Sequence, residues 1–310
     1  MTGVAQVETR LNSLFEPGFT SGDRVLMDAK GETPTPGVLR EAPVVTIRDG
    51  RDLQRRAGTS RSFTEAGFFE EHSFVLLDHT SAVRDWDNDP ATPAEDTEIT
   101  RVYFPEITSI IRERLLPGAR VEIPQVPYLL RRGPNTPNPF YGQVAHQDYG
   151  LSADDYEENV AAYGTAEAAE AWRRQYARDD VTGFLVINFW RTVYMDEPLR
   201  HLPLTICDPY TVEPRDVIST GLTNFTPTGR PSNQLGLRHN PEQHWYYYPR
   251  MNTGEVLAFK NFQCWKSDLR PKLRTCFHSA FDEPHPLEPP DVLSERQSCE
   301  YRVGVYFLKD

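Results

Sequence analysis

From residue 181 to its end, the chain is a succession of β-prone runs separated by turns. Branched and aromatic residues dominate these runs, which predicts strands. They cover residues 181–193, 202–207, 217–222, 243–248, 255–262, 275–281 and 299–308. With the strand expected near residue 146, about eight strands follow residue 120, and eight strands in two facing sheets form a jelly roll. The 26 Pro and 19 Gly residues also suit a mainly β framework better than a helical bundle.

Two stretches carry helical signals instead. In residues 100–116, apolar residues recur at steps of three and four before Pro117 and Gly118, which predicts an amphipathic helix. Residues 165–178 are rich in Ala, Glu and Arg and contain no Pro, which favours a second helix. This helix belongs to an insertion over residues 152–180 that either packs on the core or covers a site as a lid.

The expected architecture is one domain over residues 1–310. Residues 1–118 form helices and strands packed on the core, and residues 119–310 form the core itself, starting with a strand over 121–130. The fold class is therefore mainly β, with a double-stranded β-helix (jelly-roll or cupin-like) core and flanking and inserted α-helices.

A histidine and an aspartate two residues apart, His146 and Asp148, are the first sign of chemistry. Residues i and i+2 of a strand project from one face, so both side chains point into the space that the strand lines. Two histidines and one carboxylate on one face of a metal ion leave three positions open, as in non-haem Fe(II) oxygenases. His278, in a β-prone run, is the favoured second histidine, and His244 and His239 are the alternatives.

Charge and hydropathy narrow the range of partners. A net charge of −12 repels phosphate backbones and anionic lipids, so nucleic acid and membrane surfaces are not expected partners. No apolar run approaches the ~20 residues that span a bilayer, and the first residues do not resemble a secretory signal. The four cysteines lack metal-type or disulfide-type spacing, so a reduced cytoplasm is the expected location.

Seven short motifs in one order are similar to a known family. They are His-Gln-Asp-Tyr at 146–149, Asn-Phe-Trp-Arg at 188–191, Pro-Leu-Thr-Ile-Cys-Asp at 203–208, His-Trp-Tyr-Tyr-Tyr-Pro-Arg-Met at 244–251, Glu-Val-Leu-Ala-Phe-Lys at 255–260, Phe-His-Ser-Ala-Phe-Asp-Glu-Pro at 277–284 and Arg-Gln-Ser-Cys-Glu-Tyr-Arg at 296–302. Together they resemble the hydroxylase/desaturase family that includes the fungal gibberellin desaturase and the cephamycin 7α-hydroxylase component. The resemblance covers roughly residues 120–310.

The resemblance implies an Fe(II)- and 2-oxoglutarate-dependent oxygenase on a double-stranded β-helix. It implies that His146, Asp148 and His278 are the iron ligands and act in catalysis. The chain departs from the family at Gly150, where Thr is usual, at Thr192, where Pro is usual, and at residues 262–264, where Phe-Gln-Cys replaces Tyr-Asp-Ser. None of these departures falls on a proposed iron ligand, so they bear on the class of substrate.

The distal carboxylate of 2-oxoglutarate requires a fixed bidentate cation with a hydroxyl beside it, and Arg suits this role better than Lys. Arg296 and Ser298 stand two apart on a predicted strand and are the favoured pair, with Arg302 as the alternative arginine. A solvated strand edge is the competing interpretation of this polar run.

The substrate pocket is expected around a cluster of aromatic and basic residues. They are Tyr149, Trp190, Arg191, His244 and Tyr246. Arg191 either binds substrate or pairs with a structural carboxylate, and it faces away from Asn188 because the two are three residues apart on a strand.

The expected function is C–H oxidation of a small molecule in secondary-metabolite biosynthesis, by hydroxylation, desaturation or oxidative cyclisation, with O2 as co-substrate. Two alternatives remain. A zinc hydrolase also uses two histidines and a carboxylate, and a jelly roll can bind a small molecule without catalysis.

Overall fold

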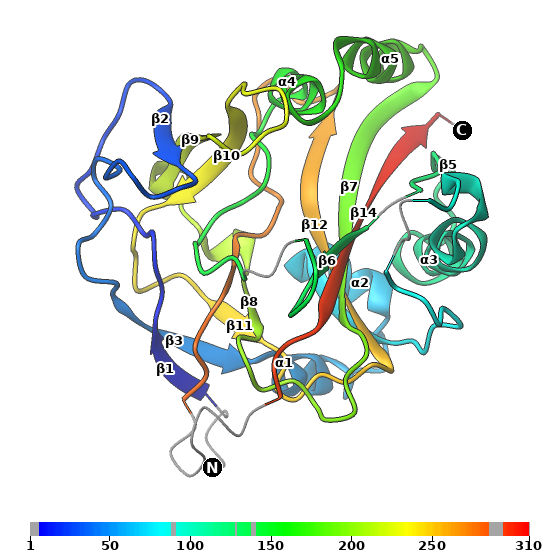
Figure 1. Ribbon diagram of the computed structural model, residues 1–310, viewed down its shortest axis with the longest axis horizontal. Coiled ribbons are helices and arrows are strands. Elements are labelled where there is room, and N and C mark those ends of the chain that lie inside the picture. Colours follow the sequence, from blue (N-terminus) through cyan, green and yellow to red (C-terminus); the bar gives the residue numbers. More distant parts are fainter. Residues whose placement is uncertain (1–5, 88–90, 128, 138–140, 285–293, 310) are drawn as a thin grey trace.

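The computed structural model describes residues 6–87, 91–127, 129–137, 141–284 and 294–309. Its largest sheet has six strands, all paired antiparallel, in the order β4-β12-β7-β14-β5, with β6 also paired to β14. The strands are β4 (Phe74–Asp78), β5 (Val121–Glu122), β6 (Leu130–Arg132), β7 (Val181–Thr192), β12 (Glu255–Trp265) and β14 (Ser298–Leu308). Figure 1 shows β12, β7 and β14 side by side at the centre of the molecule.

A second sheet faces the first and has the order β1-β3-β11-β8-β13. Its strands are β1 (Gln6–Arg10), β3 (Val44–Asp49), β8 (Leu204–Cys207), β11 (Trp245–Tyr247) and β13 (His278–Ala280). A small third sheet, β10-β9-β2, contains β2 (Val25–Asp28), β9 (Val217–Thr223) and β10 (Ser232–Leu237). Strands from residues 1–118 are hydrogen-bonded members of all three sheets, so this part of the chain completes the sheets as well as covering them.

Both faces of β7 are buried, which explains its nearly continuous apolar sequence. One face packs against the helical segment around α3 (Phe104–Ile110), which continues as π-type turns at Ile99–Tyr103 and Ile111–Leu115. The other face looks toward the second sheet and, at one end, toward α5 (Ala166–Ala177), whose Trp172 packs on Phe184. We call these the outer face and the inner face of the large sheet.

The remaining helices are short. They are α1 (Gly50–Ala57), α2 (Glu65–His72), α4 (Ala153–Tyr163) and the 3-10 turns Ala94–Asp96, Pro209–Thr211 and Pro214–Asp216. Figure 1 places α4 and α5 together above the ends of β12 and β7. Among the described residues, no helix is both long and apolar enough to cross a membrane.

The strand expected over residues 121–130 is wrong in extent, because only its ends pair with β14 among the residues of this range that the structure describes. Pro124 and Pro127 lie between the two paired segments, and proline has no N–H to donate to a ladder. The helices expected over 100–116 and 165–178 are present with nearly the expected bounds.

All four cysteines are buried free thiols: Cys207, Cys264, Cys276 and Cys299. Burial raises the pKa of each, to about 11 for Cys264 and to about 12 for Cys299. Each thiol is therefore kept protonated in the interior.

Candidate metal centre

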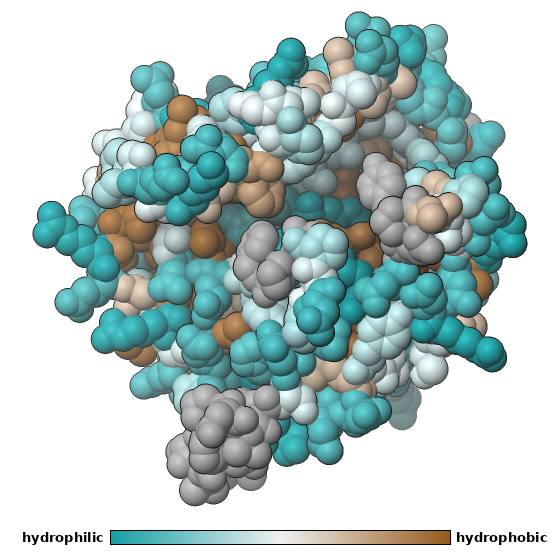
Figure 2. All heavy atoms as spheres, viewed as in Figure 1, coloured by the Kyte–Doolittle hydropathy of each residue, from teal (hydrophilic) through white to brown (hydrophobic). Residues whose placement is uncertain are grey.

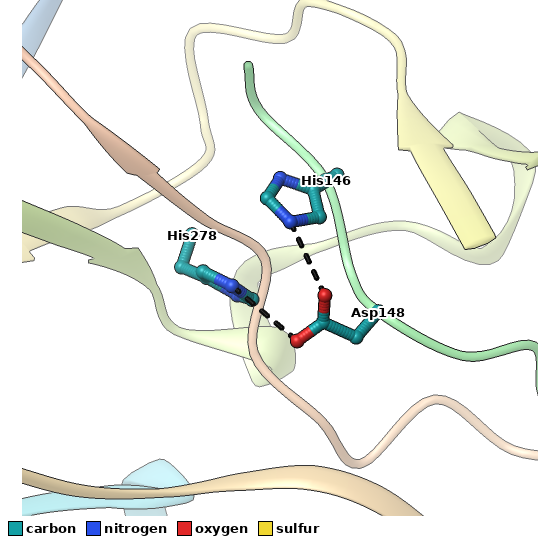
Figure 3. Close-up of side chains that lie close together, drawn as sticks. All are labelled: His146, Asp148 and His278. Carbon is teal, nitrogen blue, oxygen red and sulfur yellow. Dashed lines mark ion pairs between the residues drawn. The ribbon is translucent and has the colours of Figure 1, made fainter. Parts of the chain in front are cut away.

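His146, Asp148 and His278 come together between the two facing sheets, and their ligand atoms lie within 4.8 Å of one another. The Asp148 carboxylate is 3.3 Å from Nε2 of His146 through Oδ1 and 3.7 Å from Nε2 of His278 through Oδ2. Figure 3 shows the three side chains converging from two chain segments. His146 pairs with His278 through an isolated β-bridge, so the backbone sets their spacing.

Each imidazole is oriented by a backbone carbonyl two residues earlier. Nδ1 of His146 is 2.6 Å from the carbonyl of Val144, and Nδ1 of His278 is 3.4 Å from that of Cys276. A carbonyl only accepts hydrogen bonds, so Nδ1 carries the proton and Nε2 is left with its lone pair toward the other ligands. Metal-binding histidines are commonly held in this way.

Local charges keep Asp148 ionised. Burial favours the neutral acid, but Arg302, His146 and His278 outweigh it and hold the pKa of Asp148 well below its usual range. Burial and the neighbouring His146 lower the pKa of His278 to about 4. The His146 pKa is raised because the hydrogen bond and charge of Asp148 outweigh burial. A neutral His278 and an ionised Asp148 are the protonation states that a metal requires.

Strand β14 presents a polar row to this centre. Its register pairs Ser298 with Thr192, Glu300 with Trp190 and Arg302 with Asn188, and paired residues share a face. Arg302 Nη2 lies 3.0 Å from Asp148 Oδ2 and 2.9 Å from Glu300 Oε2. Alternation along the strand therefore places Ser298, Glu300 and Arg302 on the inner face.

Arg296 lies just before this row and is almost fully buried. Its guanidinium is sandwiched against the rings of Tyr141 and Trp190, at 4.3 and 5.6 Å from their centroids, and donates to the carbonyl of Leu202. Burial lowers its pKa to about 10. Nε of Arg296 and Oγ of Ser298 are both buried without a hydrogen-bond partner among the described residues. Unsatisfied buried donors of this kind are rare and fit an absent ligand.

Tyr149 and helix α4 border the centre on another side. Tyr149 meets Phe262 edge to face, and burial raises the pKa of Tyr149 to about 12. Asn159 of α4 donates to the backbone carbonyl of Asp148 and to that of Asn233. The inserted helix is thus tied to the ligand loop. Figure 2 shows this side of the molecule hollowed near its centre, below α4, with hydrophilic residues visible inside.

Three of the residues expected to bind substrate lie elsewhere. Arg191 pairs in register with Cys299 on the outer face, where it contacts His79 and donates to the carbonyl of Thr253. The large sheet therefore lies between Arg191 and the metal centre, and of its two expected roles this position favours the structural one. Tyr246 is packed against Phe74 in the core, two strands from His278. His244 lies two residues before Tyr246, and its backbone carbonyl accepts a hydrogen bond from the backbone N–H of Asp208.

Three polar residues at the centre were not identified from the sequence. Asn261 donates to Oδ2 of Asp148 at 2.8 Å. Arg132 lies beside Ser298 across the β6–β14 ladder. Nε of Arg132 is 3.5 Å from Oε1 of Glu300. A polar residue inside an apolar strand was the available signal for Asn261, and it is the same signal that drew attention to Asn188.

The fold and the site define a mainly β protein with two histidines and one carboxylate gathered between facing sheets. Residues 29–306 match the family described as "Oxidoreductase/YMDC permease-like domain", and the chain belongs to this family. No curated protein matches the chain.

Solved structures share the fold over the whole chain. One structure of the iron and alpha-ketoglutarate-dependent endoperoxidase NvfI is 19% identical with a TM-score of 0.61, covering 98% of this chain and 99% of that one. A variant of the same enzyme is 20% identical with a TM-score of 0.63, covering 100% of both chains. At this level of identity the similarity concerns the fold.

Proposed function

We propose that the chain is a non-haem Fe(II)- and 2-oxoglutarate-dependent dioxygenase, built as one catalytic domain on a double-stranded β-helix. The observation that supports this most directly is the group His146, Asp148 and His278, with both Nε2 atoms and one carboxylate facing a common point. The name and fold of the endoperoxidase structures agree with this proposal.

The donor set fits iron better than a closed structural site. Two imidazoles and one carboxylate leave three positions open on an octahedral ion, and this arrangement is typical of Fe(II) oxygenases. When bound there, Fe(II) with 2-oxoglutarate would activate O2 for oxidation of a C–H bond. The residues of this chain would hold the metal, orient the co-substrate and confine the reaction.

Arg296 and Ser298 are proposed to hold the distal carboxylate of 2-oxoglutarate. Nε of Arg296 and Oγ of Ser298 are unpartnered, and the aromatic rings of Tyr141 and Trp190 fix the guanidinium plane. Arg132, in register with Ser298, adds positive charge on the same side. Arg302 is already engaged by Asp148 and Glu300, which favours Arg296 for this role.

The proposed substrate is a small molecule from secondary metabolism, bound in the hollow near the metal centre. Tyr149 and Trp190 remain candidates for its walls, since both lie on the inner side. Asn188 has a buried side chain with neither amide atom partnered among the described residues, so it is available to a polar group of the substrate. Residues 152–180 would cover the site through α4, and a cytoplasmic location is part of the proposal.

The test is anaerobic reconstitution with Fe(II), followed by 2-oxoglutarate titration and O2-uptake measurement. We expect one Fe(II) per chain, and succinate formation that depends on both O2 and 2-oxoglutarate. His278→Ala should reduce metal affinity by more than the roughly 10- to 100-fold that loss of an outer-shell partner costs.

His244→Ala is the matched control, because it removes a histidine that is not part of the candidate metal-binding group among the described residues, and it should bind iron normally. Retention of iron by His278→Ala would overturn the ligand assignment. Hydrolytic products formed by the zinc-loaded protein without O2 would overturn the reaction class.

A further inference from the structure

The two oxygens of the Asp148 carboxylate have different surroundings. Oδ2 accepts from Nδ2 of Asn261 at 2.8 Å and lies 3.0 Å from Nη2 of Arg302. Oδ1 has Nε2 of His146 as its near neighbour, at 3.3 Å. Oδ2 thus meets two protein donors, although it also lies 3.7 Å from Nε2 of His278, whereas Oδ1 lies nearest to His146.

Asn261 reaches Asp148 because of an irregularity in β12. The pairing with β7 shifts between Lys260 and Phe262, so Asn261 has no partner across the ladder. Such a bulge turns two consecutive side chains to one face. Asn261 consequently contacts Asp148 while the next residue, Phe262, packs on Tyr149.

The same residue also fixes the backbone on which the ligands lie. The carbonyl of Asn261 accepts a hydrogen bond of 2.6 Å from the side chain of Gln147, which lies between His146 and Asp148. The amide of Gln147 in turn accepts from the backbone N–H of Tyr149. The carboxylate and its loop are therefore both attached to the bulge.

The chemistry of the Asn261–Asp148 contact determines which end of the Asn261 amide faces the carboxylate. An ionised carboxylate only accepts hydrogen bonds, so Asn261 must present its NH2 group to Asp148. Oδ2 of Asp148 accepts from both an amide and a guanidinium. It therefore has little remaining capacity to bind a metal.

We infer that Asn261 and Arg302 are positioning residues that hold Oδ2 away from the metal, so that Asp148 binds through Oδ1 alone. The inference rests on the proposed function. If Asp148 bound through both oxygens, only two positions of an octahedral ion would stay open. A chelating co-substrate would then fill both, and none would remain for O2.

The experiment uses Asn261→Leu, which has the same branched shape and no donor, in protein loaded with Co(II). The visible absorption of Co(II) reports the number of its ligands, and a crystal structure of the loaded protein gives both carboxylate–metal distances. In the wild type we expect one bound oxygen of Asp148. In Asn261→Leu we expect both oxygens to bind and 2-oxoglutarate affinity to fall about 10- to 100-fold, with metal stoichiometry kept.

Asn159→Leu is the matched control, because Asn159 is also a buried amide but donates to the backbone carbonyl of Asp148. It should lower stability without changing the Co(II) spectrum. If Asn261→Leu does not fold, Arg302→Met tests the second donor by the same spectrum, and Arg302→Lys should restore the wild-type spectrum in part.

The possible outcomes separate the two proposals. A wild-type spectrum and unchanged 2-oxoglutarate affinity in Asn261→Leu would overturn the positioning role alone. A wild-type protein that binds no divalent metal would overturn the proposed function.

Discussion

Two buried arginines lie on opposite faces of the large sheet and illustrate two uses of the same side chain. Arg191, on the outer face, meets His79 and the carbonyl of Thr253, and lies over the rings of Trp86 and Tyr103. Arg296, on the inner side, is sandwiched between rings but meets only the carbonyl of Leu202 among the described residues. Burial is nearly complete for both, so burial alone does not separate a structural cation from a ligand-binding one.

The hydrogen-bond partners of the two arginines distinguish the structural one from the ligand-binding one. The acceptors around Arg191 are Nδ1 of His79 and the backbone carbonyls of His79 and Thr253, so its charge is used inside the protein. Nε is unpartnered in both arginines among the described residues, but Arg296 has one side-chain hydrogen bond there and stands two residues before the unpartnered hydroxyl of Ser298, so its charge is available to an anion. The comparison predicts that loss of Arg296 affects ligand binding and that loss of Arg191 affects stability.

The largest effect is expected for Arg296→Met. Loss of one partner of a buried charged contact costs about 2–5 kcal/mol, so the dissociation constant of 2-oxoglutarate should rise by roughly 30-fold or more. The free energy of unfolding should change by about 1 kcal/mol or less, because the lost hydrogen bond is offset by removal of a desolvated charge. Calorimetric titration of the metal-loaded protein measures the first effect and urea unfolding the second. An unchanged dissociation constant would move the role to Arg132 or Arg302.

Arg191→Met should show the reverse pattern. The carbonyls of His79 and Thr253 would lose a charged donor inside the protein, which costs about 1.5–3 kcal/mol of the free energy of unfolding. Affinity for 2-oxoglutarate should stay at the wild-type value, as measured in the same two assays. A large loss of affinity with normal stability would contradict the assignment of Arg191 to the outer face.

The smallest effect concerns His79, which accepts from Arg191 through Nδ1. Burial and the positive charge of Arg191 lower the His79 pKa below its usual value. The unfolded chain therefore binds a proton below a pH of about 6.5 that the folded protein resists, and stability falls as the pH drops through that region. His79→Asn, whose amide oxygen can replace Nδ1, should make this fall in stability smaller. Urea unfolding at several pH values tests it, and an unchanged slope would show that other histidines cause the fall.

The pairing of His146 with Asp148 was accessible from the sequence because it depends on local geometry, whereas His278 was chosen from its β-prone run and the family resemblance. His146 and Asp148 share a face through their spacing of two, and His278 lies in a β-prone run that the fold brings beside them. The opposite orientations of Asn188 and Arg191 were accessible for the same reason. The sequence did not show whether Asn188 or Arg191 points toward the metal centre, because that depends on where the second sheet packs.

The orientation of Asn261 toward Asp148 could not be predicted from the sequence, for a different reason. Its orientation follows from a shift in register between β12 and β7, and no glycine or other local signal in residues 255–265 marks the bulge. The position of Tyr246 in the core was likewise set by packing against Phe74, a residue 172 positions away. Long-range register and packing are the parts of the site that the local pattern did not specify.

The four buried thiols have a practical consequence. A thiol reacts as its thiolate, so burial and a raised pKa together shield each cysteine from alkylating agents and from peroxide. An enzyme that combines iron with O2 would thereby keep its cysteines out of reach of stray oxidants. Because labelling must wait for the chain to open, the rate of iodoacetamide incorporation should follow the opening of the native state as denaturant is added. Rapid labelling of the native protein would mean that one of the thiols is transiently accessible, and the modified cysteine, found by mass spectrometry, would identify the segment that opens.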